Sequence, residues 1–142
     1  MKYFIDTSLF IDVFDKAKPE AINKLTPILE DETSEFFINR LVYLETLRTV
    51  KLSNSKNFQA LKAVFEGFTI LDINQAIYDQ AISLSRYCQS NGITLKGRCA
   101  AIDFLHFTTA KYYELEMLAN DGEFKNLAEA YIEWFNKFCR SG

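Results

Sequence analysis

Four acidic residues occupy positions from which their carboxylates could act together: Asp6, Glu45, Asp103 and Asp121. Asp6 directly follows one short apolar run, and Asp121 follows another near the other end of the chain. Glu45 and Asp103 lie inside the mostly apolar segments LVYLETL and CAAIDFLHF. A carboxylate in apolar surroundings is costly unless it is paired or bound to a cation. The set therefore predicts a site for a hard cation such as Mg²⁺ or Mn²⁺, which prefers oxygen ligands.

Each acid taken alone also has an ordinary structural explanation. Asp6 could cap a helix, and Asp121 could be a turn residue in Asn-Asp-Gly. Glu45 could pair with Arg48, three positions further along. Asp103 is the hardest to explain in this way, because no Lys or Arg lies three or four positions from it. The four acids together favour a functional site over four separate structural roles.

The elements that must position these acids follow from hydrophobic periodicity. Short apolar runs predict four β-strands, at residues 2–5, 35–38, 68–73 and 115–119. Apolar residues at helical spacing predict helices in the segments between them and after the last one. In the helix expected to end near Leu52, a stripe should face the core: Leu41, Leu44, Leu47 and Leu52. Alternating strands and helices predict an α/β fold with a parallel sheet covered on both faces. Such sheets bind ligands at the carboxyl ends of their strands, where Asp6 and Asp121 are expected.

Composition limits the class of protein. The 142 residues contain no repeat and no Pro/Gly/Ser-rich linker, which predicts a single domain over residues 1–142. A net charge of −3 argues mildly against nucleic-acid binding, although a metal site must carry carboxylates of its own. Three widely spaced cysteines match neither a zinc site nor a disulfide framework and suggest reduced thiols in a cytoplasmic protein. No apolar stretch approaches the ~20 residues that would span a membrane.

Four segments resemble the sequence motifs of the PIN domain, and within it the VapC-like toxins of toxin–antitoxin pairs. In chain order these segments are YFIDTSLFID, NRLVYLETL, GRCAAIDFLHFTTA and LEMLANDGEFKNL. Some positions depart from the family pattern. Asn39 stands where Ser or Thr is usual, Ala119 replaces a hydroxyl residue two before Asp121, and Glu123 stands where Asp is common. Residues 125–138 also predict a helix where the family has a fifth strand.

The resemblance implies a three-layer α/β/α fold with a short central parallel sheet. It implies that Asp6, Glu45, Asp103 and Asp121 are the catalytic residues and bind Mg²⁺ or Mn²⁺. Thr7, Ser8 and Asn120 would support these acids or contact the substrate. The implied activity is endonucleolytic hydrolysis of RNA, and the implied partners are a small antitoxin and a second copy in a homodimer. RNA would also need cations near the acids, for which the candidates are Lys96, Arg98, Arg40 and Arg48.

Other classes fit the residues less well. An aspartyl-phosphate phosphatase needs a second acid two residues after the first, where Ser8 stands. A receiver domain would place its phosphorylated Asp near the middle of the chain and a Lys after a late strand. Two alternatives within the family stay open: a scaffold that has lost catalysis and only binds a protein partner, and a housekeeping RNA-processing nuclease.

Overall fold

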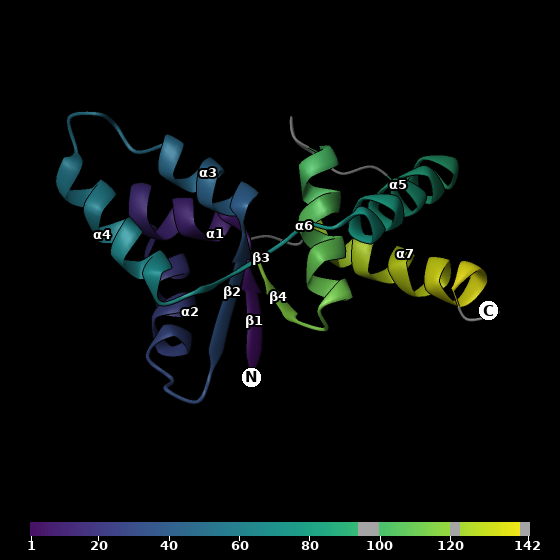
Figure 1. Ribbon diagram of the computed structural model, residues 1–142, viewed down its shortest axis with the longest axis horizontal. Coiled ribbons are helices and arrows are strands. Elements are labelled where there is room, and N and C mark those ends of the chain that lie inside the picture. Colours follow the sequence, from purple (N-terminus) through teal and green to yellow (C-terminus); the bar gives the residue numbers. More distant parts are fainter. Residues whose placement is uncertain (94–99, 120–122, 140–142) are drawn as a thin grey trace. The chain divides into compact units, whose positions relative to one another are not determined.

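The computed structural model describes residues 1–93, 100–119 and 123–139, which form two compact units (Figure 1). The first unit is drawn from residues 1–72 and 113–120 and contains the whole β-sheet. The second is drawn from residues 73–112 and 121–142, and its described elements are helices. The expectation of one domain over residues 1–142 stays a prediction.

The sheet of the first unit has four strands, all parallel to their neighbours. In chain order they are β1 (Lys2–Ile5), β2 (Glu35–Asn39), β3 (Thr69–Leu71) and β4 (Glu116–Leu118). The order across the sheet is β3-β2-β1-β4, and Phe4 pairs with Phe37 on one side and Met117 on the other. The predicted α/β fold with a short central parallel sheet is confirmed. Since all four strands run in parallel, their carboxyl ends share one edge of the sheet.

Five helical segments complete the first unit. They are α1 (Thr7–Phe10), the π-helical turn η1 (Ile11–Asp15), α2 (Pro19–Leu29), α3 (Arg40–Arg48) and α4 (Ser55–Glu66). Polar caps start two of them directly at strand ends: Asp6 caps α1 after β1, and Asn39, the last residue of β2, caps α3. Such caps satisfy N–H groups that the first helical turn leaves without partners. Both helices therefore begin at the carboxyl edge of the sheet.

The expected apolar stripe of α3 is wrong at two of its four leucines. Leu44 is 57% exposed and Leu52 is fully exposed, whereas Val42, Thr46 and Leu47 are buried. The helix also ends at Arg48 rather than near Leu52, which lies in a turn. The cap at Asn39 fixes where the helix begins and hence which face turns inward. The inward face therefore contains Val42, Thr46 and Leu47, whereas Leu44 lies on the solvent face.

Aromatic side chains hold α1 against α4 and the sheet. The ring of Phe10 meets Phe65 edge-on with centroids 5.0 Å apart and lies 5.8 Å from Phe68. Phe68 in turn stacks on Phe36 of β2 at 5.4 Å. Pairs of this kind contribute about 0.5–1.5 kcal/mol each beyond the area they bury. Phe10 is fully buried, so its packing in the core fixes the position of α1, the helix that follows Asp6.

The second unit consists of α5 (Gln75–Ser90), α6 (Ala100–Tyr112) and α7 (Glu123–Phe138). The inward face of α5 is formed by the buried side chains of Ile77, Ala81, Leu84 and Cys88. Helix α7 confirms the helix expected where the family has a fifth strand, and its Trp134 donates to Ser83 Oγ of α5 at 2.9 Å. Two of its aromatic residues face solvent, since Phe135 and Phe138 are 42% and 56% exposed. Across the described ranges, no helix combines the length and the apolar character that crossing a membrane requires.

Candidate metal centre

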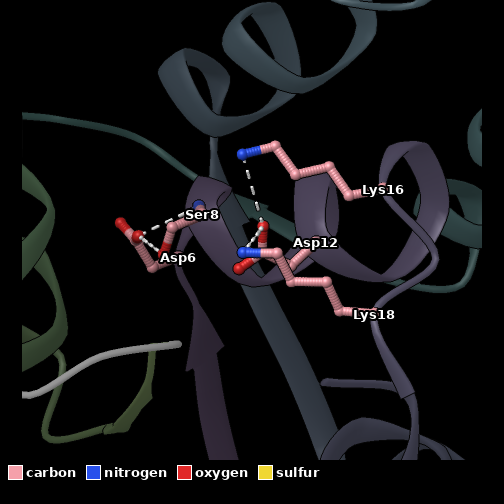
Figure 2. A network of polar contacts seen from close by, with 5 residues as sticks. All are labelled: Asp6, Ser8, Asp12, Lys16 and Lys18. Atoms are coloured by element: carbon pink, nitrogen blue, oxygen red, sulfur yellow. Dashed lines mark hydrogen bonds and ion pairs between the residues drawn. The ribbon is translucent and has the colours of Figure 1, made fainter. Parts of the chain in front are cut away.

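Asp6 lies at the carboxyl end of β1, and its carboxylate is almost completely buried. Its backbone N–H donates to the Leu118 carbonyl at 2.8 Å, which ties it to the end of the neighbouring strand β4. Its Oδ2 accepts two hydrogen bonds from Ser8, from the backbone N–H at 3.1 Å and from the hydroxyl at 2.6 Å (Figure 2). One carboxylate oxygen is thus fully engaged in holding the start of α1.

The second oxygen of Asp6, Oδ1, is buried and has no hydrogen-bond partner among the described residues. Leaving a buried acceptor without a partner costs about 1–3 kcal/mol, and more when the group is charged. A bound cation would supply the partner that this oxygen lacks. The carboxylate therefore fits a hard divalent cation such as Mg²⁺ or Mn²⁺, whose preferred ligands are oxygens of this kind. The capping role considered from sequence is present too, but it accounts for only one of the two oxygens.

Glu45 is connected to the same region through Thr7. It lies in the second turn of α3, half-buried, and its Oε1 accepts a hydrogen bond from the Thr7 hydroxyl at 2.9 Å. Thr7 is buried and is the residue directly after Asp6. At its other end, α3 is anchored by Asn39, whose Oδ1 accepts from the Val42 N–H at 2.9 Å. The structure thus brings Glu45 to the residue that neighbours Asp6, although the two acids are far apart in sequence.

The contribution of the other two predicted acids to this site stays a prediction. Asp103 lies in the first turn of α6, half-buried, and belongs to the second unit. Asp121 and Asn120 lie outside the described residues. His106, one turn after Asp103, is buried in its helix. A cluster of three or more His, Cys, Asp or Glu side chains suited to a metal is not found within the described part of the chain. Asp6 with Glu45 is consequently the part of the four-acid set that the structure assembles.

Of the four predicted RNA-contacting cations, two are described. Arg40 forms an ion pair with Asp72, which directly follows β3, so its charge is compensated by a neighbour on the same edge. Arg48 is exposed in the last turn of α3. A cation at this end of a helix interacts favourably with the negative end of the helix dipole. Lys96 and Arg98 lie outside the described residues. RNA contact by these four residues stays a prediction.

A second buried acid, Asp12, was not identified from the sequence. It lies in η1, and Lys18 and Lys16 surround it, with Nζ atoms 3.3 Å and 3.8 Å from its Oδ1 (Figure 2). The Lys18 N–H also donates to the Asp12 carbonyl at 2.8 Å, across a turn in which Ala17 adopts a φ of 48°. The sequence feature that could have indicated this cluster is an acid followed by lysines four and six residues later. Because two cations compensate it, Asp12 differs from Asp6, whose free oxygen has no such partner.

Comparison with known proteins identifies the family. The model of the PIN domain matches residues 3–130 of this chain. A search of curated protein sequences gives no match. Among solved structures, the fold is similar to VapBC2 from Rickettsia felis bound to a promoter DNA fragment, with a TM-score of 0.69 and 16% identity over 89% of this chain and 92% of that one.

Two further structures show the same likeness. One is a toxin–antitoxin complex from Klebsiella pneumoniae, with a TM-score of 0.63 and 20% identity over 86% of this chain and 89% of the other. The second is VapC20 of Mycobacterium tuberculosis, described as a toxin that cleaves the sarcin–ricin loop, with a TM-score of 0.65 and 15% identity over 87% and 93%. At such identities the likeness concerns the fold. The family model covers most of the chain, and the chain therefore belongs to the PIN domain family.

Proposed function

We propose that this protein is a metal-dependent endoribonuclease and the toxin of a toxin–antitoxin pair. The observation that carries the nuclease proposal is the buried Asp6 carboxylate, with one oxygen held by Ser8 and the other without a partner. A structural cap would need only the first oxygen. Membership of the PIN domain family adds support, because the segment that contains Asp6 resembles the first motif of that family.

In this proposal the chain's own residues create a site for one or two divalent cations. Asp6 offers Oδ1, and Ser8 prevents the carboxylate from rotating by holding Oδ2 at 2.6 Å. Thr7 fixes one oxygen of Glu45 at 2.9 Å, so the remaining oxygen has a defined direction. We assign Asp103 and Asp121 as the further ligands. A bound Mg²⁺ or Mn²⁺ would supply activation of water and stabilisation of charge during phosphodiester hydrolysis.

Cleavage of RNA by the purified protein tests the nuclease proposal. We expect cleavage with Mg²⁺ or Mn²⁺ and none after the metal is removed with EDTA. Asp6→Asn should reduce the rate by at least about a hundredfold, because an amide oxygen is a weaker ligand and carries no charge. Asp31→Asn is a matched control, since Asp31 is an exposed residue of the same unit that precedes β2, at the other end of the strands. Full activity of Asp6→Asn would refute the assignment of the metal site.

The toxin proposal rests on the similar structures, which include two toxin–antitoxin assemblies and one RNA-cleaving toxin. A toxin of this kind would act in the cytoplasm on RNA, and a small antitoxin protein would block it. Expression should arrest bacterial growth, and co-expression of a small neighbouring reading frame should restore it. Harmless expression of a protein that cleaves RNA in vitro would favour a housekeeping nuclease. Absence of cleavage together with antitoxin binding would favour a scaffold. The homodimer stays a prediction, which the mass in solution would test.

A further inference from the structure

Lys24, a residue that the sequence analysis did not single out, reaches from α2 to the carboxyl edge of the sheet. Its Nζ donates to the Ala119 carbonyl at 2.6 Å, across 95 positions of the chain. Ala119 directly follows β4, and the carbonyl before it, that of Leu118, accepts from the Asp6 N–H. The ammonium of Lys24 is thus fixed to the backbone one residue from the point where Asp6 is attached.

The charge of Lys24 is not cancelled by the group that holds it. Several other cations in the described part of the first unit form ion pairs with carboxylates: Lys2 with Glu35, Lys16 and Lys18 with Asp12, and Arg40 with Asp72. Lys24 is instead held by a neutral carbonyl, and its side chain is exposed. An ammonium has three N–H donors and no acceptor, so two donors remain for a further partner.

We propose that Lys24 is a substrate-binding residue, contacting a backbone phosphate of the RNA at the edge of the acidic site. This inference rests on the proposed nuclease function. RNA that approaches carboxylates is repelled unless cations neutralise its phosphates, and this chain carries a net charge of −3. Lys24 provides a full positive charge that the fold directs to the strand ends. A cation held by a carbonyl loses less freedom on binding RNA than a mobile surface lysine would.

The salt dependence of RNA binding tests this contact. Binding of a short, fluorescently labelled single-stranded RNA is measured from low to high salt in the Asp6→Asn background, which prevents cleavage. Each phosphate contact contributes about 0.7 to the slope of log affinity against log salt, which corresponds to about fivefold in affinity at 0.1 M salt relative to 1 M. Lys24→Met should lower the slope by about that amount. Lys24→Arg keeps the charge and should restore it.

Lys51→Met is the matched control, because it removes the same charge from an exposed position beyond the far end of α3. It should leave the slope unchanged. In the active protein, Lys24→Met should raise KM several-fold with little change in kcat. If Lys24→Met lowers the melting temperature or kcat but leaves the slope and KM unchanged, the residue is only a tether and the inference is overturned. If the protein that retains Lys24 binds no RNA, the proposed nuclease function is refuted, and this inference is refuted with it.

Discussion

Asp6, Thr7 and Ser8 are consecutive residues whose side chains serve different partners. Ser8 turns back to hold Asp6, whereas Thr7 reaches across to α3 and holds Glu45. This division is possible because the chain passes directly from a strand into a helix, where successive side chains point in different directions. A single short segment therefore orients two carboxylates that lie far apart in the sequence. In the proposed site, Thr7 would act by orienting Glu45 and need not touch the reacting groups.

Removing the Thr7 hydroxyl should weaken metal binding while preserving the fold. Thr7→Val keeps the shape of the side chain but leaves Glu45 Oε1 without this donor. Loss of a group that orients a metal ligand costs about 10- to 100-fold in metal affinity or activity. The rate of RNA cleavage, measured against Mn²⁺ concentration, should show a higher half-saturating concentration. Thr7→Ser keeps the hydroxyl and should stay close to the wild type. An unchanged metal titration for Thr7→Val would exclude Glu45 from the site or Thr7 from its support.

The Asp12 cluster should contribute to stability rather than to catalysis. Asp12→Asn removes a buried charge that compensates Lys16 and Lys18, both about half exposed to water. Water screens the lysines, so we expect a loss of only about 1 kcal/mol in the free energy of unfolding. Urea denaturation should show this loss, and the loss should shrink at high salt because screening weakens the wild-type pairs. RNA cleavage should be retained. A large loss of activity in a folded protein would instead place Asp12 in the site.

At the scale of elements, the polar cap of α3 determines where Glu45 lies. Asn39 stands where the family usually has Ser or Thr, yet its side-chain oxygen accepts from the Val42 N–H as a capping hydroxyl would. The residue is fully buried at the end of a central strand. The departure from the family pattern therefore preserves the local function of the position. Asn39 thus both ends β2 and caps α3.

Asn39→Ala should therefore affect both stability and activity. Loss of an N-cap costs about 0.5–2 kcal/mol, and the buried position suggests the upper part of that range. Chemical denaturation should show this decrease, and the rate of RNA cleavage should fall because the start of α3 can fray. Asn39→Ser restores a capping oxygen and should recover much of both. If Asn39→Ala is destabilised but cleaves RNA at the wild-type rate, the cap does not position Glu45.

The sequence predicts the four strands and a cap at Asp6 because those signals are local. Residues 2–5 favour a strand and are followed at once by a capping Asp, so both β1 and the place of Asp6 could be foreseen. The inner face of α3 could not, because Leu44 and Leu52 are apolar but point to solvent. The contact of Thr7 with Glu45 spans 38 positions and that of Lys24 with Ala119 spans 95. Such pairings depend on how the helices pack, which no local pattern encodes.

At the scale of the whole molecule, the four predicted acids are divided between two compact units. Asp6 and Glu45 belong to the sheet-containing unit and Asp103 to the helical one. The PIN family model nevertheless spans residues from both units as one continuous match. The match therefore supports one domain over the residues that it covers. The single domain over residues 1–142 stays a prediction, which unfolding experiments can test.

The reactivity of Cys88 tests whether the helical unit opens independently. Cys88 is buried in α5, and burial raises the pKa of its thiol, whereas Cys139 is exposed. A raised pKa keeps the Cys88 thiol protonated at pH 8, so two effects, burial and protonation, protect it from alkylation. The neutral thiol supports folding at pH values below its unfolded pKa, and this contribution is lost as the pH rises above that value. Native protein should therefore react with iodoacetamide at Cys139 before it reacts at Cys88.

The rate at which Cys88 is alkylated then measures the free energy of the opening that exposes it. If the chain is one cooperative domain, this free energy equals that of global unfolding, obtained from far-UV circular dichroism in urea. The opening free energy at Cys88 and the free energy of global unfolding should then decrease with urea concentration at the same rate, because both processes expose the same surface. Mass spectrometry of the peptide that contains Cys88 separates its signal from those of the other cysteines. A markedly lower opening free energy at Cys88 would show that α5–α7 unfold on their own, and the single-domain prediction would then be wrong.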